Sequence, residues 1–333
     1  MTTTPIPYSV LDLATVIQGK TPADSFRNSL SLARHAEQLG YHRFWLAEHH
    51  NMESVASSAT AVLIGHIAGG TKKMRVGSGG IMLPNHAPLI VAEQFGTLES
   101  LYPGRIDLGL GRAPGTDQVA AHAIRRKNFG AEHNFMEDIS ELQRLFSAAN
   151  SKSNLRAIPG EGLDIPIWIL GSSTDSARVA AAMGLPYAFA SHFAPTYFLQ
   201  AIALYRQYFQ PSVHLKKPRV MACVNVVAAD TDVQAARLAT SVEQLFIGVI
   251  SGKRRLLQPP VEDMNDTWTA EQAAAVQHML TYSFIGSADT ITKKMKSFLA
   301  QTSVDEVMAT SHIFDHAERL RSYEIFADVM NKM

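Results

Sequence analysis

The chain has 333 residues with 30 basic and 30 acidic side chains, so its formal net charge is zero, and 46% of its residues are hydrophobic. The balanced charge argues against a general binder of nucleic acid or anionic membranes, and the single cysteine, Cys223, excludes an intrachain disulfide and a cysteine-based metal site. No apolar run is long enough to span a membrane and the N-terminal residues lack signal-peptide features, so we expect a cytoplasmic protein.

Strand and helix patterns alternate along the chain, with Gly and Pro residues where they end. The predicted strands are 6–13, 43–47, 75–83, 105–110, 166–170, 186–190, 219–228 and 304–310. The predicted helices are 22–39, 60–69, 88–101, 132–148, 174–183, 195–209, a helix capped by Asp230 that runs to about 248, and 316–330. This alternation is typical of an α/β protein with a parallel sheet.

Eight strand–helix units without a low-complexity linker favour an α/β fold with one (β/α)₈ TIM barrel over residues 1–333. A doubly wound sheet would carry a glycine fingerprint after its first strand, where this chain has Leu13-Ala14-Thr15. Residues 251–281 combine an irregular stretch with a helix. We expect them to form an insertion before the eighth strand and to act as a lid.

Glu48, His49 and His50 directly follow the second predicted strand, and chemistry in such folds gathers at the carboxyl ends of strands. They could form a metal site, an acid–base pair or a satisfied polar cluster. Adjacent histidines in extended chain point to opposite sides, so at most one should face a common pocket. The helical His-Glu-x-x-His spacing of zinc enzymes is absent, and we predict no metal site.

Three further strand ends carry glycine, hydroxyl or basic residues. Gly79 and Gly80 mark either a barrel bend or a place where a flat ligand lies against the backbone. Arg112 is either half of a surface ion pair or a partner for phosphate. A strand-to-helix junction forms either a plain helix cap or an anion site, through Gly171, Ser172, Ser173 and Ser176.

The histidines His122, His133, His192 and His312 are isolated in the sequence, and we predict structural or surface roles for them. Apolar walls for a pocket are expected from Met82, Leu83 and Phe193.

Taken in order, these segments resemble the bacterial luciferase-like family of flavin-dependent monooxygenases, and within it the alkanal-monooxygenase-like oxidoreductases. The matching residues are 44–50, 76–84, 104–112, 172–174, 184–186 and 284–287. The resemblance implies an enzyme that uses reduced FMN, supplied by a separate flavin reductase, and O₂. It would add oxygen to a small organic substrate through a C4a-peroxyflavin. The resemblance also implies a homodimer that packs barrel helices from the first half.

The resemblance assigns roles to individual positions. The histidine matching His49 serves catalysis beside the flavin, and Glu48 would orient it or a neighbouring backbone group. The Gly79-Gly80 position often carries a non-proline cis peptide against the flavin ring. The remaining cofactor-binding positions lie at the phosphate end, with phosphate contacts from those matching Arg112, Ser173 and Ser176, and with Gly171 and Ser172 beside them.

Two departures from luciferase argue against light emission and long-chain aldehyde specificity. Gly111 stands where luciferase has a reactive cysteine, and Ser172 stands where it has a glutamate. Three alternatives stay open at this point: a deazaflavin (F420)-dependent hydride-transfer oxidoreductase on the same barrel, a non-catalytic flavin-binding protein, and a metal-dependent barrel hydrolase that uses Glu48 and His49.

Overall fold

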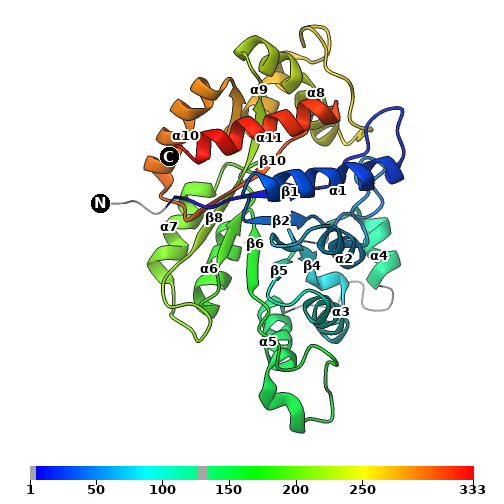
Figure 1. The fold of residues 1–333 in the computed structure, drawn as a ribbon, viewed down its shortest axis with the longest axis vertical. Coiled ribbons are helices and arrows are strands. Elements are labelled where there is room, and N and C mark those ends of the chain that lie inside the picture. The colour runs from blue at the N-terminus through cyan, green and yellow to red at the C-terminus, as the bar shows by residue number, and fades with distance from the viewer. Residues whose placement is uncertain (1–4, 114, 126–133) are drawn as a thin grey trace.

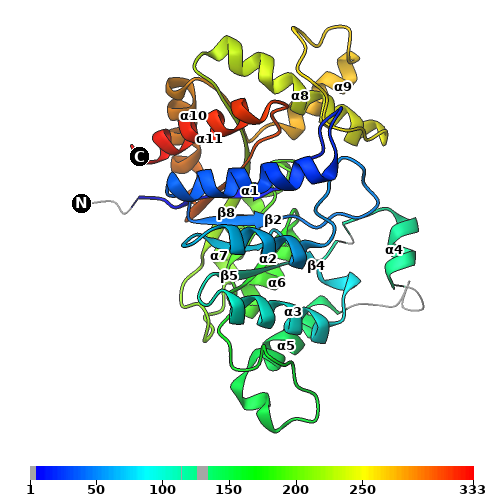
Figure 2. The ribbon, with the colours of Figure 1, turned by 45° about the vertical axis from the view of Figure 1, so that its right-hand side comes forward.

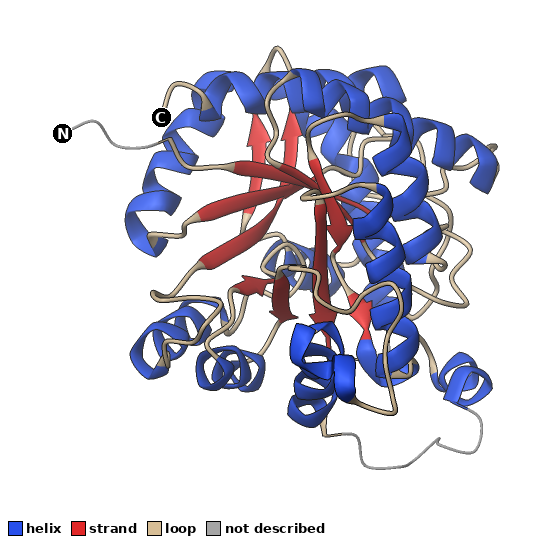
Figure 3. Ribbon diagram, turned by 60° about the horizontal axis from the view of Figure 1, so that its bottom comes forward, coloured by secondary structure: helices blue, strands red, loops and turns tan. Residues whose placement is uncertain are grey.

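The computed structural model describes residues 5–113, 115–125 and 134–333. Eight parallel strands close into a barrel in the order β1-β2-β3-β5-β6-β7-β8-β10, because β10 pairs with both β8 and β1. Figure 3 shows the strands gathered at the centre with helices around them. The predicted (β/α)₈ TIM barrel is therefore confirmed.

The elements have the following bounds. The strands are β1 (Tyr8–Asp12), β2 (Arg43–Leu46), β3 (Arg75–Ser78), β4 (Ile81–Met82), β5 (Ile106–Gly111), β6 (Ile167–Gly171), β7 (Tyr187–Phe189), β8 (Val220–Ala228), β9 (Ser283–Gly286) and β10 (Glu306–Thr310). The helices are α1 (Pro22–Gln38), α2 (Thr60–Gly70), α3 (Pro88–Leu101), α4 (Gln118–Arg125), α5 (Phe135–Phe146), α6 (Thr174–Met183), α7 (Phe198–Tyr208), α8 (Asp232–Ser251), α9 (Ala270–Met279), α10 (Ala288–Thr302) and α11 (His316–Met330). Short 3₁₀ helices span Leu83–Asn85 and Ala148–Lys152. The first and last helices, α1 and α11, lie side by side (Figures 1 and 2).

The structure differs from the predicted strands in two places. The predicted strand 75–83 is divided into β3 and β4, with Gly79 and Gly80 between them. The predicted strands also omitted β9. β9 has only four residues and pairs with the end of β8, outside the closed barrel, so it adds no barrel strand.

The helix predictions need three corrections. The cap of α8 is Thr231, whose side chain accepts the Gln234 N–H, whereas the predicted cap Asp230 forms an ion pair with Arg321. The predicted helix 132–148 corresponds to α5, which ends at Phe146, and its first two residues lie outside the described part of the chain. The short helix α4 was not predicted. Among the described residues no helix has both the length and the apolar character that a membrane span requires.

Side chains alternate along each strand, so one set faces the helices and the other fills the barrel. On β2, Phe44 and Leu46 pack among the helices, whereas Trp45 points inward and meets Trp168 edge to face at 5.5 Å. The middle of the barrel is a dry layer made of Leu11, Trp45, Ala47, Trp168, Ala188, Met221, Cys223 and Met308. A ligand therefore cannot pass through the barrel and can bind only at one end or the other.

The amino-terminal end of the barrel is occupied by a buried network of charges. Arg43 donates to Asp107 at 2.5 Å and to Glu306 at 2.7 Å. Burial alone would raise the pKa of Asp107, but Arg43 and Arg75 hold it below its usual value. Because each carboxylate depends on buried or half-buried guanidinium groups, this end of the barrel has a structural role.

We predict that Arg43→Met lowers the free energy of unfolding by about 3–5 kcal/mol, because it leaves two buried carboxylates without their central cation. Urea denaturation measures the change. The control is Arg237→Met, which breaks the exposed Arg237–Glu262 pair and should cost no more than about 1 kcal/mol. Equal losses in the two variants would contradict the structural role of the network.

Candidate active site

A cavity of about 230 Å³ opens at the carboxyl ends of the barrel strands. All of the predicted site residues except Glu48 line it: His49, Gly79, Gly80, Arg112, Gly171, Ser172, Ser173 and Ser176. Met82 and Phe193 also line it, as predicted, whereas Leu83 is fully buried in the core outside the barrel. A wider cavity of about 650 Å³ involves α8, α9 and α10 and contains none of the predicted site residues.

His49 reaches the cavity because it continues the inward side of β2, two residues beyond Ala47. Its Nδ1 lies 3.2 Å from the carbonyl oxygen of Gly115, which can only accept, so Nδ1 carries the proton and Nε2 holds a lone pair. Burial lowers the pKa of His49, although the hydrogen bond to Gly115 opposes that shift. His49 is therefore a neutral imidazole near neutral pH, with Nε2 able to accept a proton.

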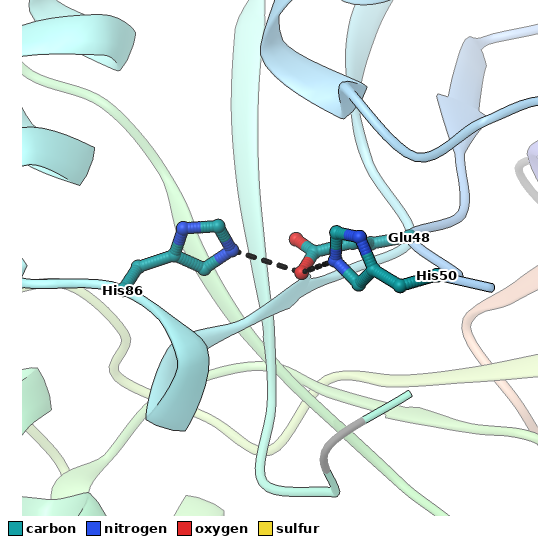
Figure 4. Close-up of side chains that lie close together, drawn as sticks. All are labelled: Glu48, His50 and His86. Atoms are coloured by element: carbon teal, nitrogen blue, oxygen red, sulfur yellow. Dashed lines mark hydrogen bonds and ion pairs between the residues drawn. The ribbon is translucent and has the colours of Figure 1, made fainter. Parts of the chain in front are cut away.

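Glu48 is not among the residues that line this cavity. Its carboxylate binds two other histidines (Figure 4). One carboxylate oxygen, Oε1, accepts from His50 Nε2 at 2.9 Å and from His86 Nε2 at 2.8 Å. The other, Oε2, accepts the Met82 backbone N–H at 3.2 Å. Glu48 therefore links the end of β2 to β4 and to the segment before α3. Of the two roles expected for it, the hydrogen bonds match the orientation of a neighbouring backbone group.

Glu48, His50 and His86 are also the residues whose chemistry suits a metal ion, since their ligand atoms lie within 4.8 Å of one another. In the arrangement of Figure 4 both imidazoles direct a ring N–H at the same carboxylate oxygen. These bonds and the Met82 N–H satisfy the buried carboxylate without a cation. His86 could not be assigned to this cluster from the sequence, because the segment after β4 brings it to Glu48 only in the folded chain.

The Gly79–Gly80 peptide bond is cis, as the resemblance predicts. A Cβ atom on Gly79 would lie 2.6 Å from Leu11 Cδ1, and one on Gly80 would lie 2.7 Å from the carbonyl oxygen of Gly109. Both positions are therefore too close to their neighbours for a side chain. The result is a cavity wall made of bare backbone, against which a flat ring can lie.

Arg112 and the start of α6 form the polar end of the cavity. The Arg112 guanidinium is about half exposed and lies 3.5 Å from the Asp175 carboxylate, so it takes part in a loose ion pair. Ser173 caps α6 by accepting the Ser176 N–H at 3.4 Å. The Ser176 hydroxyl donates to the Ser173 carbonyl oxygen at 2.8 Å. The interpretation of this junction as a helix cap is thus confirmed. The N–H groups of the first turn of α6 lie beside Arg112, where they can donate to an anion.

Several lining residues were not identified from the sequence. His192 was predicted to be structural, yet it lines the cavity two residues beyond Ala190. Leu11, Leu13 and Leu170 add apolar wall. Side chains alternate between the two sides of a strand, so exact strand ends would have indicated these inward positions from the sequence. Of the other isolated histidines, His312 is buried and His133 lies outside the described residues.

A closed (β/α)₈ barrel whose polar residues gather at the carboxyl ends of its strands is the architecture of a TIM-barrel enzyme. Residues 7–306 match the family model of the luciferase-like monooxygenases, so the chain belongs to that family and is an oxidoreductase.

Three relatives illustrate this membership. The uncharacterized protein YvbT of Bacillus subtilis is 56% identical over 322 residues, which cover 96% of each chain. A luciferase-like monooxygenase of Escherichia coli strain K12 is 48% identical over 333 residues, covering 100% of this chain and 99% of the relative. The N-acetyl-S-alkylcysteine monooxygenase of Bacillus subtilis is 41% identical over 189 residues, covering 56% of this chain and 57% of that enzyme.

Solved structures share the fold. Apo-MsnO8 has a TM-score of 0.86 and 33% identity, covering 99% of this chain and 98% of its own. The oxygenating constituent of 3,6-diketocamphane monooxygenase from Pseudomonas putida, in complex with FMN, has a TM-score of 0.75, 18% identity and 98% coverage of both chains. An F420-dependent secondary alcohol dehydrogenase has a TM-score of 0.68, 16% identity and 98% coverage of both chains. The fold is thus used with both kinds of flavin.

Hydrogen bonds keep the Glu48 carboxylate ionised, which makes its contribution to stability depend on pH. Burial raises its pKa, but hydrogen bonds from His50 and His86 outweigh burial and bring the pKa to about 2, below the ordinary value of 4.5. Its stabilising effect is therefore present above about pH 4.5 and is lost as the pH falls towards about 2. We expect Glu48→Gln to lower the free energy of unfolding by about 3 kcal/mol at neutral pH, by about half as much near pH 3, and by still less as the pH falls to about 2.

Urea denaturation of the native protein and the variant across this pH range checks the prediction. Glu262→Gln is the control, because Glu262 is exposed and its replacement should change stability by less than about 0.5 kcal/mol. A loss at Glu48 that did not depend on pH would contradict the ionised, hydrogen-bonded carboxylate.

Proposed function

We propose that the protein is an FMN-dependent monooxygenase that acts on a small organic substrate. One oxygen atom of O₂ would enter the substrate and the other would leave as water, with the two electrons supplied by reduced FMN from a separate reductase. The observation that carries the proposal is that one cavity of a luciferase-like barrel combines a bare glycine wall with Arg112 and the start of α6.

The described residues fit FMN by their chemistry. Gly79 and Gly80 line the cavity with backbone and without side chains, so a flat ring could lie against them. Arg112, with Ser172 and Ser173 at the start of α6, offers a cation, hydroxyls and backbone N–H groups to a phosphate. When bound, the reduced flavin would supply the electrons and the reactivity toward O₂, which no side chain provides.

The chain's own residues would then orient the reactants, handle protons and keep the site dry. His49 would hold or transfer a proton at Nε2, since its Nδ1–H is committed to Gly115. Leu11, Leu13 and Phe193 would exclude water from the reacting groups. Glu48 would act through Met82, whose N–H it holds next to the glycine wall.

Contacts made by the segment 251–281 support its proposed role as a lid. Leu257 pairs with the loop after β1, accepting the Gln18 N–H at 2.9 Å and donating to the Val16 carbonyl oxygen at 3.0 Å. Arg254 lies near enough to His49 to contribute to the lowering of its pKa. We therefore propose that this insertion covers the mouth of the cavity and completes it when substrate is bound.

We also propose that the protein is a homodimer located in the cytoplasm. Exposed apolar side chains on helices of the first half support the homodimer: Val62 on α2, and Ile90 and Leu101 on α3.

The choice of cofactor is tested by anaerobic titration of the purified protein with oxidised FMN, reduced FMN and reduced F420, followed by a pulse of oxygen. We expect tight binding of reduced FMN and a transient absorbance change before oxidised flavin appears. Binding of F420 alone would assign the protein to hydride transfer. Binding without any reaction with oxygen would favour a non-catalytic flavin carrier.

Arg112 is expected to bind the phosphate, so Arg112→Ala should weaken FMN binding by about tenfold or more. Riboflavin lacks the phosphate, and its affinity should stay unchanged. Quenching of flavin fluorescence measures both. Arg178→Ala, which removes an exposed arginine from the same helix α6, is the control for net charge. A parallel loss of riboflavin binding would place Arg112 elsewhere in the site.

His49→Ala should reduce turnover of a substrate found by screening by about 10²–10⁴-fold while flavin binding persists. In the native enzyme the rate should hold as the pH falls below 6.5, the ordinary pKa of histidine, because the pKa of His49 is lowered. Product formation across pH measures both effects. His66→Ala, at an exposed position on α2, is the control. Normal turnover in His49→Ala would remove His49 from the mechanism.

A further inference from the structure

One side of the barrel mouth carries buried polar atoms that have no partner among the described residues. They are Asp12 Oδ2, His192 Nδ1, Asn225 Oδ1, Ser311 Oγ and His312 Nδ1. These residues lie at or just beyond the carboxyl ends of β1, β7 and β10, and on β8 at the level where Asn225 is in register with Thr310. The four strands are neighbours in the barrel. Since buried polar groups are nearly always paired, such a concentration points to a ligand.

His192 connects this side of the mouth to the proposed flavin cavity. Of the three residues His192, Asn225 and His312, it is the one that lines the cavity; only 8% of it is exposed, and its Nδ1 has no hydrogen-bond partner in the described part of the chain. Asn225 holds the segment in place, because its Nδ2 donates to the His192 carbonyl oxygen at 2.5 Å. That bond fixes the orientation of the amide and leaves Oδ1 as an unpaired acceptor.

The groups around His192 carry little free charge. Burial lowers the pKa of His192 to about 3 and that of His312 to about 4, so both imidazoles are neutral near neutral pH. His49 is also neutral, and the Arg319 guanidinium is paired with Asp12 at 2.8 Å. A charged substrate group would therefore lose its hydration here without gaining a counter-ion.

The unpaired atoms define the group they would bind. Asn225 Oδ1 needs a hydrogen-bond donor, and a neutral imidazole offers one N–H and one lone pair. The complementary group is uncharged and both donates and accepts, as an amide or an alcohol does. The apolar wall of Leu11, Leu13 and Phe193 adjoins it and suits a hydrocarbon chain.

We propose that His192 and Asn225, with His312 beside them, form the substrate subsite and bind an amide or alcohol group of an otherwise apolar substrate. The inference rests on the proposed flavin-dependent function, for which it names the substrate class. His192 is thereby a specificity-determining residue, distinct from His49.

The test uses four probes with chains of similar length: hexanamide, hexanol, butyl methyl ketone and hexanoate. Each is titrated into the FMN-loaded protein and followed by the absorbance of the bound flavin, and by calorimetry with and without FMN. The variants are His192→Phe, which keeps the ring shape, and His192→Gln, which restores a donor and an acceptor. Ser241→Ala is the control, because it removes another buried, unpaired hydroxyl from α8, away from the cavity.

Hexanamide and hexanol should bind about tenfold or more tighter than the ketone and hexanoate. His192→Phe should abolish this preference, and His192→Gln should restore part of it. The FMN affinity of both His192 variants should match that of the native protein. Ser241→Ala should rank the four probes as the native protein does. Tightest binding by hexanoate or the ketone, or an unchanged ranking in His192→Phe, would overturn the subsite.

The ranking in the unmodified protein tests the proposal even if the His192 variants do not fold. Should FMN fail to bind the native protein, the flavin-dependent function fails, while calorimetry without FMN still decides the subsite by the same ranking.

Discussion

The pairing of β10 with both β8 and β1 is the constraint on which the rest of the structure depends, because it closes the sheet and gives every strand an inside. The inward positions then form layers along the barrel. A charged layer around Arg43 lies at one end, a dry layer around Trp45 fills the middle, and a polar layer that includes His49 and His192 lies at the other. The apolar layer separates the two polar ones, and the predicted site residues gather around the cavity at the carboxyl end of the barrel.

Within the open end, Glu48 and His49 share a strand end but serve different sides of it. The two-residue period of an extended chain directs His49 into the cavity and leaves Glu48 on the opposite side, where His50 and His86 donate to it. Glu48 still influences the cavity, because its second oxygen holds the Met82 N–H immediately after the glycine wall. Adjacent residues thus face different surroundings: His49 lines the cavity, and Glu48 holds the backbone beside it.

The sequence predicted the barrel, and most of the cavity, because periodicity, glycines and prolines are local signals. The junction around Ser173 and the glycines at 79 and 80 could be found in this way, and the resemblance to a known family pointed to His49, which lines the same cavity. What local signals could not supply were contacts between distant segments, such as His86 with Glu48 or Asn225 with His192. The extra strand β9 was missed because four residues at a barrel edge carry little pattern.

The two halves of the barrel mouth have complementary chemistry. The strands β3, β5 and β6 contribute bare backbone, a cation and a helix start, where hydrogen bonds are largely satisfied within the protein. The strands β7, β8, β10 and β1, with the residues just beyond them, contribute buried side-chain atoms that have no partner in the part of the chain that the structure describes. His49 after β2 and His192 after β7 both line the cavity between these halves. A cofactor held by the first half and a substrate held by the second would meet between the two imidazoles, both of which burial keeps neutral.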